Sequence, residues 1–121
     1  MNHSQQVQQI TDLLASWANA LRRKDVSKIM ALYHNDIVAF DAIAQLQFKG
    51  KASYRAHWQR CMEFCGGESL FEVHQLQVRA DQQLAFSHSL NHCGGTNDKG
   101  EMQRCWMRAT QCWQQGNDGW K

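Results

Sequence analysis

The sequence contains no proline, no long apolar run and no marked excess of one charge, and each absence excludes a class of protein. No stretch is long and apolar enough to cross a bilayer, and the polar, glutamine-rich first nine residues are unlike a secretory signal. The net charge of +2 comes from 13 basic and 11 acidic residues scattered along the chain. A nucleic-acid binder would show a basic stripe or a reading motif, and neither is present. We therefore expect neither a membrane nor a nucleic acid as partner.

The five cysteines lack the paired spacings of a disulfide framework. An odd number without such spacing favours free thiols in a reducing compartment, so we expect a cytoplasmic protein. Cys61 and Cys65 stand four apart, but no second pair follows them at zinc-like spacing. His88 and His92 are also four apart, which on a strand separates them by roughly 13 Å. We expect no metal and no other cofactor, since no glycine-rich phosphate loop follows a strand either.

What is present indicates one globular domain over residues 1–121. A chain of this length buries about two-thirds of its unfolded surface and needs no disulfide or metal to fold. The hydrophobic share of 43% and the charged share of 20% are ordinary for such a domain.

Helical periodicity dominates the first half of the chain. Apolar residues within 7–21 fall on one stripe, with Ser4 as the candidate N-cap of that helix. A second, short helix is predicted to begin at Asp25, and a third to span residues 51–64. We therefore expect three helices ahead of most of the sheet.

Strand patterns dominate the second half. Two short strands are predicted at 37–41 and 45–49, and three longer ones at about 70–79, 84–92 and 102–114, joined by hairpin connections. This order predicts an α+β fold with helices on one face of a mainly antiparallel sheet. Without proline the strands can run uninterrupted, so any strong curvature must come from bulges or glycines.

Five stretches carry a family resemblance: LLASWANA at 13–20, ALYHNDIVAFD at 31–41, GKASYRAHW at 50–58, AFSHS at 85–89 and WMRAT at 106–110. Together, in this order and at these intervals, they resemble the SnoaL-like and ketosteroid-isomerase-like domains of the nuclear-transport-factor-2-like superfamily. The resemblance implies a cone-shaped fold, a cystatin-like roll, with three helices packed on a strongly curved sheet. Members include isomerases, cyclases, dehydratases and assembly domains, so the fold alone leaves the function open.

The end of the chain departs from that pattern. Similar proteins continue past a turn of this kind into a final strand inside the sheet, whereas this chain stops at Trp120 and Lys121, where that strand would begin. We therefore expect the final strand to be absent. A missing inner strand leaves backbone groups of its neighbours unpaired. Either the chain is shortened, or a dimer partner or an altered strand order covers the gap.

Asp41 is the most informative candidate for chemistry, because it stands where the resemblance places the catalytic base. A carboxylate in an apolar cone has a raised affinity for protons and can move a proton beside a carbonyl. The structural alternative is that Asp41 caps a turn or pairs with Arg108. Trp17 replaces the family's tyrosine donor and no acid lies within 106–110, so the steroid-isomerase mechanism itself is not expected.

Arg108 and His88 are the other catalytic candidates. Arg108 alternates onto one strand face with Trp106, where it can hold Asp41 ionised, bind a ligand carboxylate or enolate, or form a structural pair. His88 shares a face with Phe86 and Leu90, which we predict to be inward because both neighbours are apolar. A histidine there serves as an acid or base less often than as a hydrogen-bonded core residue, and the same holds for His57.

Aromatic residues from separate elements are expected to fill the core and to line the cavity of the cone. The candidate ligand-binding residues are Trp17, Tyr33, Tyr54, Trp58 and Trp106.

The leading hypothesis is a small-molecule pocket protein, with isomerase, cyclase or dehydratase chemistry in which Asp41 transfers a proton next to a carbonyl. Its partner would be a small apolar or carbonyl-containing molecule. The alternative is a non-catalytic ligand-binding or assembly module that forms a homodimer through the sheet. A third reading is an eroded relative with little activity left.

Overall fold

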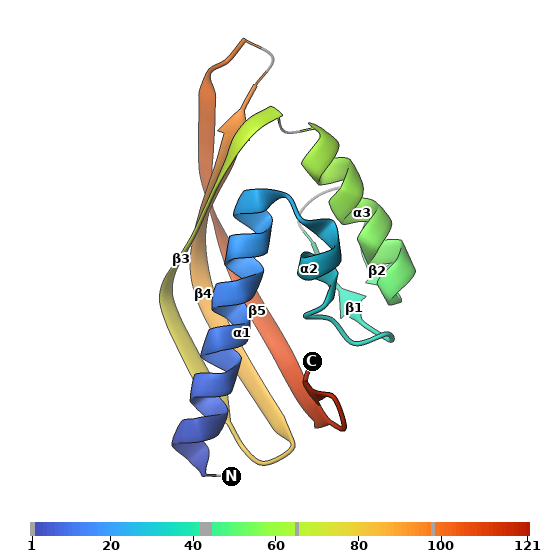
Figure 1. Cartoon of the computed structure of the whole chain (residues 1–121), viewed down its shortest axis with the longest axis vertical. Helices are drawn as coiled ribbons and strands as arrows, with labels where there is room; N and C mark the ends of the chain where they lie inside the picture. The colour runs from blue at the N-terminus through green and yellow to red at the C-terminus, as the bar shows by residue number, and fades with distance from the viewer. Residues whose placement is uncertain (1, 42–44, 65, 98) are drawn as a thin grey trace.

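Three helices lie on one side of a long, curled antiparallel sheet in the computed structural model, which describes residues 2–41, 45–64, 66–97 and 99–121 (Figure 1). The helices are α1 (His3–Arg23), α2 (Val26–Met30) and α3 (Lys51–Phe64). The strands are β1 (Val38–Ala39), β2 (Phe48–Lys49), β3 (Gly66–Ala80), β4 (Leu84–Thr96), β5 (Met102–Gly116) and β6 (Gly119–Trp120). The predicted α+β class and the cystatin-like roll are confirmed.

The helices begin where side chains can accept their first backbone N–H groups. Asn2, rather than Ser4, caps α1: its side chain accepts from the Gln5 N–H, and the Gln5 side chain accepts from the Asn2 N–H. The predicted cap was wrong because the helix starts one residue before Ser4, at His3. Asp25 caps α2 as expected, accepting from the Lys28 N–H at 3.2 Å.

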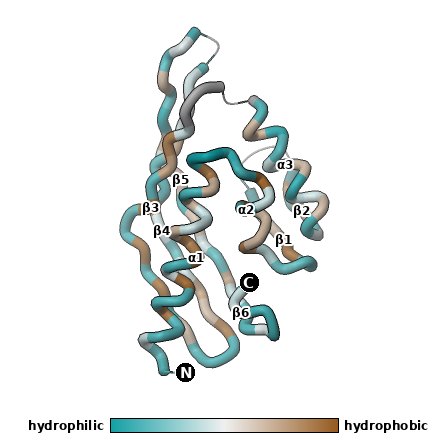
Figure 2. Tube along the Cα trace, in the orientation of Figure 1, coloured by the Kyte–Doolittle hydropathy of each residue, from teal (hydrophilic) through white to brown (hydrophobic). Residues whose placement is uncertain are grey.

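Along α1, hydrophobic and hydrophilic residues alternate at helical spacing (Figure 2), so one face is buried against the sheet while the other stays in water. Of the helices that the structure describes, none has the length and apolar character that a membrane span requires.

The main sheet has the order β3-β4-β5-β6 with every pair antiparallel, while β1 and β2 form a separate two-stranded sheet. Its curvature has the expected source, because the register of β3 against β4 shifts twice, between Gly66 and Leu70 and between His74 and Gln77. Gly94 serves a different purpose: a Cβ there would collide with the carbonyl oxygen of Gln103, so the close approach of β4 and β5 requires glycine.

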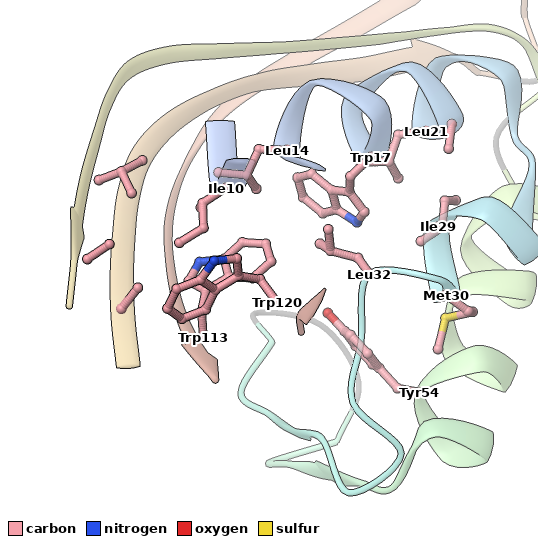
Figure 3. Packing of buried hydrophobic residues seen from close by; sticks show 14 of the residues in the cluster. Ile10, Leu14, Trp17, Leu21, Ile29, Met30, Leu32, Tyr54, Trp113 and Trp120 are labelled. Atoms are coloured by element: carbon pink, nitrogen blue, oxygen red, sulfur yellow. The ribbon is translucent and has the colours of Figure 1, made fainter. Parts of the chain in front are cut away.

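The last strand is present as two residues. Trp120 pairs with Gln115 of β5, and β6 lies at the edge of the described sheet rather than inside it. The side chain of Trp120 is buried and packs in the core beside Trp113 (Figure 3). Apart from these two residues, the described chain has no counterpart of the final inner strand of similar proteins.

The core lies between α1, α2 and the lower part of the sheet, where side chains from all three helices meet those of the strands (Figure 3). Its largest fully buried side chains are Phe48, Ile10, Ile29 and Met30. α1 packs mainly on β3, whereas α3 packs on α2 and β2. The site described below therefore lies at the junction of α3 with the first half of the chain.

The sheet face under the helices is unexpectedly polar along β4. Ser87 is fully buried, donates to the Gln111 side-chain oxygen at 2.9 Å and accepts from the Trp113 indole N–H at 3.0 Å. Ser89 donates to the Asn91 side-chain oxygen at 2.8 Å, and both are buried. These polar groups tolerate burial because they bond to one another.

This polar inner face means that the predicted orientation of β4 and β5 was wrong. Successive side chains of a strand alternate between the two faces, so burying Ser87 and Ser89 turns their neighbours outward. The residues on the outer face, away from the helices, are Phe86, His88 and Leu90 of β4 and Trp106, Arg108 and Thr110 of β5.

Candidate active site

Asp41 lies just beyond β1, and its carboxylate faces two side chains of α3. The Tyr54 hydroxyl donates to Asp41 Oδ2 at 3.2 Å, and His57 Nε2 lies 3.5 Å from the same oxygen. The Asp41 side chain is 21% exposed, whereas the His57 side chain is 5% exposed. The carboxylate thus stands at the boundary between solvent and a buried polar cluster.

Helical spacing brings the members of this cluster together. Tyr54, His57, Trp58 and Cys61 fall on one face of α3, because residues three and four apart are neighbours on a helix. The start of α3 is tied to the strand that leads to Asp41, since the Gly50 N–H donates to the Ile37 carbonyl at 2.7 Å. Gly50 takes φ of 89°, a left-handed conformation that glycine adopts without strain.

A second pair of polar groups continues the cluster into the core. The Trp17 indole N–H donates to the Tyr33 hydroxyl at 3.1 Å, and the rings of Tyr33 and Tyr54 meet edge to face at 5.1 Å. Burial raises the pKa of both tyrosines above the ordinary 10.0, and the nearby Asp41 charge raises each pKa further. Both phenols therefore stay protonated and can act as hydrogen-bond donors.

His57 is held between aromatic rings. It stacks against Tyr54 with ring centroids 5.8 Å apart, and its ring centroid lies 4.4 Å from that of Phe48. Its Nε2 also lies 3.7 Å from the thiol of Cys61, one turn further along α3. His57 is buried, as its apolar helix face predicted, but its contact with Asp41 was not foreseen. The signal available was its spacing of three residues from Tyr54.

Trp58 adds a hydrogen-bond donor on the same helix face. Its indole Nε1 is buried without a hydrogen bond of standard geometry, yet it lies close enough to the Tyr33 hydroxyl to lower the pKa of that phenol slightly. Its ring packs edge to face with Trp17 at 6.4 Å and with Tyr54 at 5.8 Å. A buried donor without an acceptor is costly unless a ligand or water completes it.

Of the predicted aromatic set, the structure brings together Trp17, Tyr33, Tyr54 and Trp58, and Tyr54 contacts Asp41. Trp106 does not join them. It is 58% exposed and stacks on His92 of the outer sheet face, with ring centroids 4.5 Å apart.

The predicted positions of Arg108 and His88 inside the cone were also wrong. Both are exposed on the outer sheet face, so Arg108 is not buried beside Asp41. Apolar Phe86 and Leu90 do not mark an inward face here, because both are exposed. Beneath the helices the sheet carries small hydrogen-bonded residues instead, which leaves the larger side chains outside.

The outer face holds a smaller polar cluster. Glu72 accepts from His92 Nδ1 at 3.0 Å and lies 3.3 Å from His74 Nε2. These two hydrogen bonds lower the pKa of the Glu72 carboxyl. Nowhere in the described ranges do three histidine, cysteine or acidic side chains gather as a metal ion would require.

Two hollows, of about 330 and 720 Å³, lie around the turn from Asp81 to Leu84. Neither includes Asp41 or the aromatic side chains around it. The Asp41 cluster is therefore separate from both hollows, and its carboxylate is partly exposed.

Comparison with known proteins decides the family. Residues 10–121, nearly the whole chain, match the family described as the SnoaL-like domain. The chain belongs to this family. Among curated proteins no match was found.

Solved structures agree with this SnoaL-like assignment. An NTF2-like protein of unknown function from Pseudomonas putida KT2440 is 44% identical over 95% of this chain and 80% of its own, with a TM-score of 0.87. A ketosteroid isomerase-like protein from Erwinia carotovora atroseptica is 19% identical over 95% of this chain and 88% of its own, with a TM-score of 0.79. The association domain of C. elegans CaMKII is 15% identical over 98% of this chain and 91% of its own, with a TM-score of 0.76. The last two likenesses concern the fold alone.

Proposed function

We propose that this SnoaL-like domain is an enzyme that moves a proton next to a carbonyl group, with Asp41 as the base. The observation that carries the proposal is the contact of one partly exposed carboxylate with two buried side chains, Tyr54 and His57. A base needs access to its substrate, and Asp41 has it. It also needs fixed orientation, which the two contacts to Oδ2 supply.

The proposed step breaks a C–H bond beside the substrate carbonyl. The Asp41 carboxylate takes the proton, the electron pair forms a carbon–carbon double bond, and negative charge develops on the carbonyl oxygen. Return of the proton to another carbon completes an isomerisation, and loss of a leaving group completes a dehydration.

The developing oxyanion needs hydrogen-bond donors that are already in place. Two candidate donors belong to the buried cluster beside Asp41: the Trp58 indole N–H, which lacks an acceptor of standard geometry, and the Tyr33 hydroxyl, whose raised pKa keeps it protonated. Because both are buried, the cluster must open for a substrate carbonyl to reach them. Trp17 donates to that hydroxyl at 3.1 Å and so orients it. The surrounding aromatic rings favour a flat or apolar substrate.

The first test is deuterium exchange beside the carbonyl in a panel of small ketones and enones, followed by NMR. A thermal-shift screen chooses the compounds, because a ligand that binds the folded state raises Tm by mass action. We expect Asp41→Asn, which keeps the shape of the side chain, to slow exchange by about 10²-fold or more.

Asp36→Asn is the matched control, since this carboxylate is 93% exposed and lies outside the cluster. It should exchange the same compounds at the wild-type rate. If Asp41→Asn keeps the wild-type rate, or only lowers stability while no compound binds, Asp41 is structural and this function is wrong.

A second candidate is a homodimeric assembly module, and a different observation favours it. Phe86, Leu90 and Trp106 expose apolar side chains on the outer sheet face, and exposed apolar patches mark interaction sites. The similarity in fold to an association domain is compatible with this role. The Asp41 site is built from α3 and the segment after β1, whereas the assembly surface lies on the outer face of the main sheet, so the two candidates do not exclude each other.

A further inference from the structure

Two cysteines face each other across neighbouring strands, away from Asp41. Cys93 of β4 and Cys105 of β5 are direct partners in the antiparallel register, and their sulfur atoms lie 3.9 Å apart. Of the other cysteines that the structure describes, Cys61 contacts His57 and Cys112 lies opposite Phe86.

The backbone already has the geometry that a disulfide needs. Directly opposed residues of an antiparallel pair have Cα atoms about 4.5 or 5.5 Å apart, and both values lie within the range of about 4.4–6.8 Å found for disulfides. The sulfur atoms must approach from 3.9 Å to bonding distance, which small side-chain rotations accomplish. Gly94, beside Cys93, allows the two strands to run close together.

Solvent reaches this pair of thiols. Cys105 is exposed and Cys93 is half-buried. An exposed thiol beside a second thiol is the arrangement in which one cysteine reacts with an oxidant and the other resolves the product.

We propose that Cys93 and Cys105 form a reversible thiol–disulfide site that exchanges with small disulfides of the glutathione class. The Cys105 thiolate attacks the small disulfide, forms a mixed disulfide and releases one small thiol. The Cys93 thiolate then attacks the Cys105 sulfur and releases the second. The protein thus gives up two electrons and two protons, and the small disulfide is reduced to two thiols.

The product is a cross-strand disulfide between β4 and β5. It closes the chain between residues 93 and 105 without moving either strand, because the two residues are already in register. The link lies outside the Asp41 cluster, so this site is independent of the proposed proton transfer.

Oxidised glutathione is the probe for the test. The folded protein is incubated with it, free thiols are blocked, and trypsin, which cleaves after lysine and arginine, releases Cys93 in peptide 80–99 and Cys105 in peptide 105–108. We expect these two peptides to be joined, the intact monomer to lose about 2 Da, and reduced glutathione to reverse both changes. Two of the five thiols should become unreactive.

Matched serine variants identify the pair. Cys105→Ser should abolish the joined peptides, whereas Cys112→Ser, which removes another exposed thiol of β5, should leave them unchanged. The proposal is wrong if the folded wild type forms no 80–99/105–108 link, if it forms only dimers of doubled mass, or if Cys112→Ser abolishes the link. Circular dichroism confirms that each variant is folded before oxidation.

Discussion

Asp41 takes its chemistry from the side chains around it. Tyr54 and His57 both contact its Oδ2, and the buried phenols of Tyr33 and Tyr54 are kept neutral by desolvation and by the Asp41 charge. A neutral phenol can share its proton with an anion without giving it away. This arrangement suits a base that must release the proton again.

The same burial predicts how the protein responds to alkali. The chain has two tyrosines, Tyr33 and Tyr54, and both have a folded-state pKa raised above 10.0. Their neutral forms stabilise the fold fully below pH 10, and this contribution is lost as pH rises, because the unfolded chain ionises first. We expect no phenolate absorbance from the folded protein just above pH 10, and its appearance together with unfolding at higher pH.

The control is the same chain in denaturant, where both phenols should ionise at their ordinary pKa. Tyr33→Phe should remove half of the phenolate signal and weaken the alkaline dependence of stability. A reversible phenolate signal near pH 10 from protein that circular dichroism shows to be folded would contradict the burial of these side chains.

The sequence points to several residues of this cluster, Asp41 through the family resemblance and Trp17, Tyr33, Tyr54 and Trp58 as aromatic candidates. In the structure Tyr54 contacts Asp41, and the aromatic side chains contact one another. Which side chains of β4 and β5 point toward the helices could not be predicted from the alternation of apolar residues. It depends on small hydrogen-bonded residues fitting beneath the helices, and no local pattern reports that packing.

Local sequence patterns predict the boundaries of the helices better than those of the short strands. α3 spans Lys51–Phe64 as predicted, with a glycine directly before it and Tyr54, His57 and Cys61 on one face. β4 and β5 begin at Leu84 and Met102 as predicted, but β4 extends to Thr96 because its register with β5 continues there. β1 and β2 have only two residues each, since only that much of each strand finds a partner.

The short helix α2 gives a test at this scale. Asp25 accepts from the Lys28 N–H and so satisfies one of the backbone donors that a helix start leaves unpaired. Because Ile29 and Met30 of this helix are buried in the core, fraying would disturb packing as well. We expect Asp25→Ala to lower the free energy of unfolding by about 1 kcal/mol, measured by urea denaturation.

Asp25→Asn should cost only a few tenths of that value, because asparagine is an equally good cap. Asp12→Ala, an exposed carboxylate in the middle of α1, controls for the loss of a charge. Equal losses for Asp25→Ala and Asp25→Asn would mean that charge, and not capping, stabilises the helix start.

For the whole molecule, the two faces of the sheet differ in an unusual way. The face beneath the helices carries buried serines and an asparagine, while the outer face exposes Phe86, Leu90 and Trp106. The inner face also buries apolar Val78, Ala85 and Trp113 in the core, so the unusual feature is the set of apolar side chains left exposed outside, which costs free energy in water. A second copy of the chain, placed face to face, would cover this surface.

This arrangement predicts a dimer formed through the outer sheet face, which a substitution on that face should weaken. A stable interface buries about 800 Å² per partner, and large aromatic side chains near its centre dominate the affinity. Trp106 is 58% exposed and stacks on His92, so it presents a flat, fixed surface. We expect sedimentation to show a dimer for the wild type, and Trp106→Lys to weaken dimerisation by roughly 30-fold or more, the effect of about 2 kcal/mol.

Leu46→Lys is the control, because Leu46 is 91% exposed but lies near β2, away from this face. The predicted interface is wrong if the wild type sediments as a monomer at tens of micromolar, or if Trp106→Lys leaves the dimer intact.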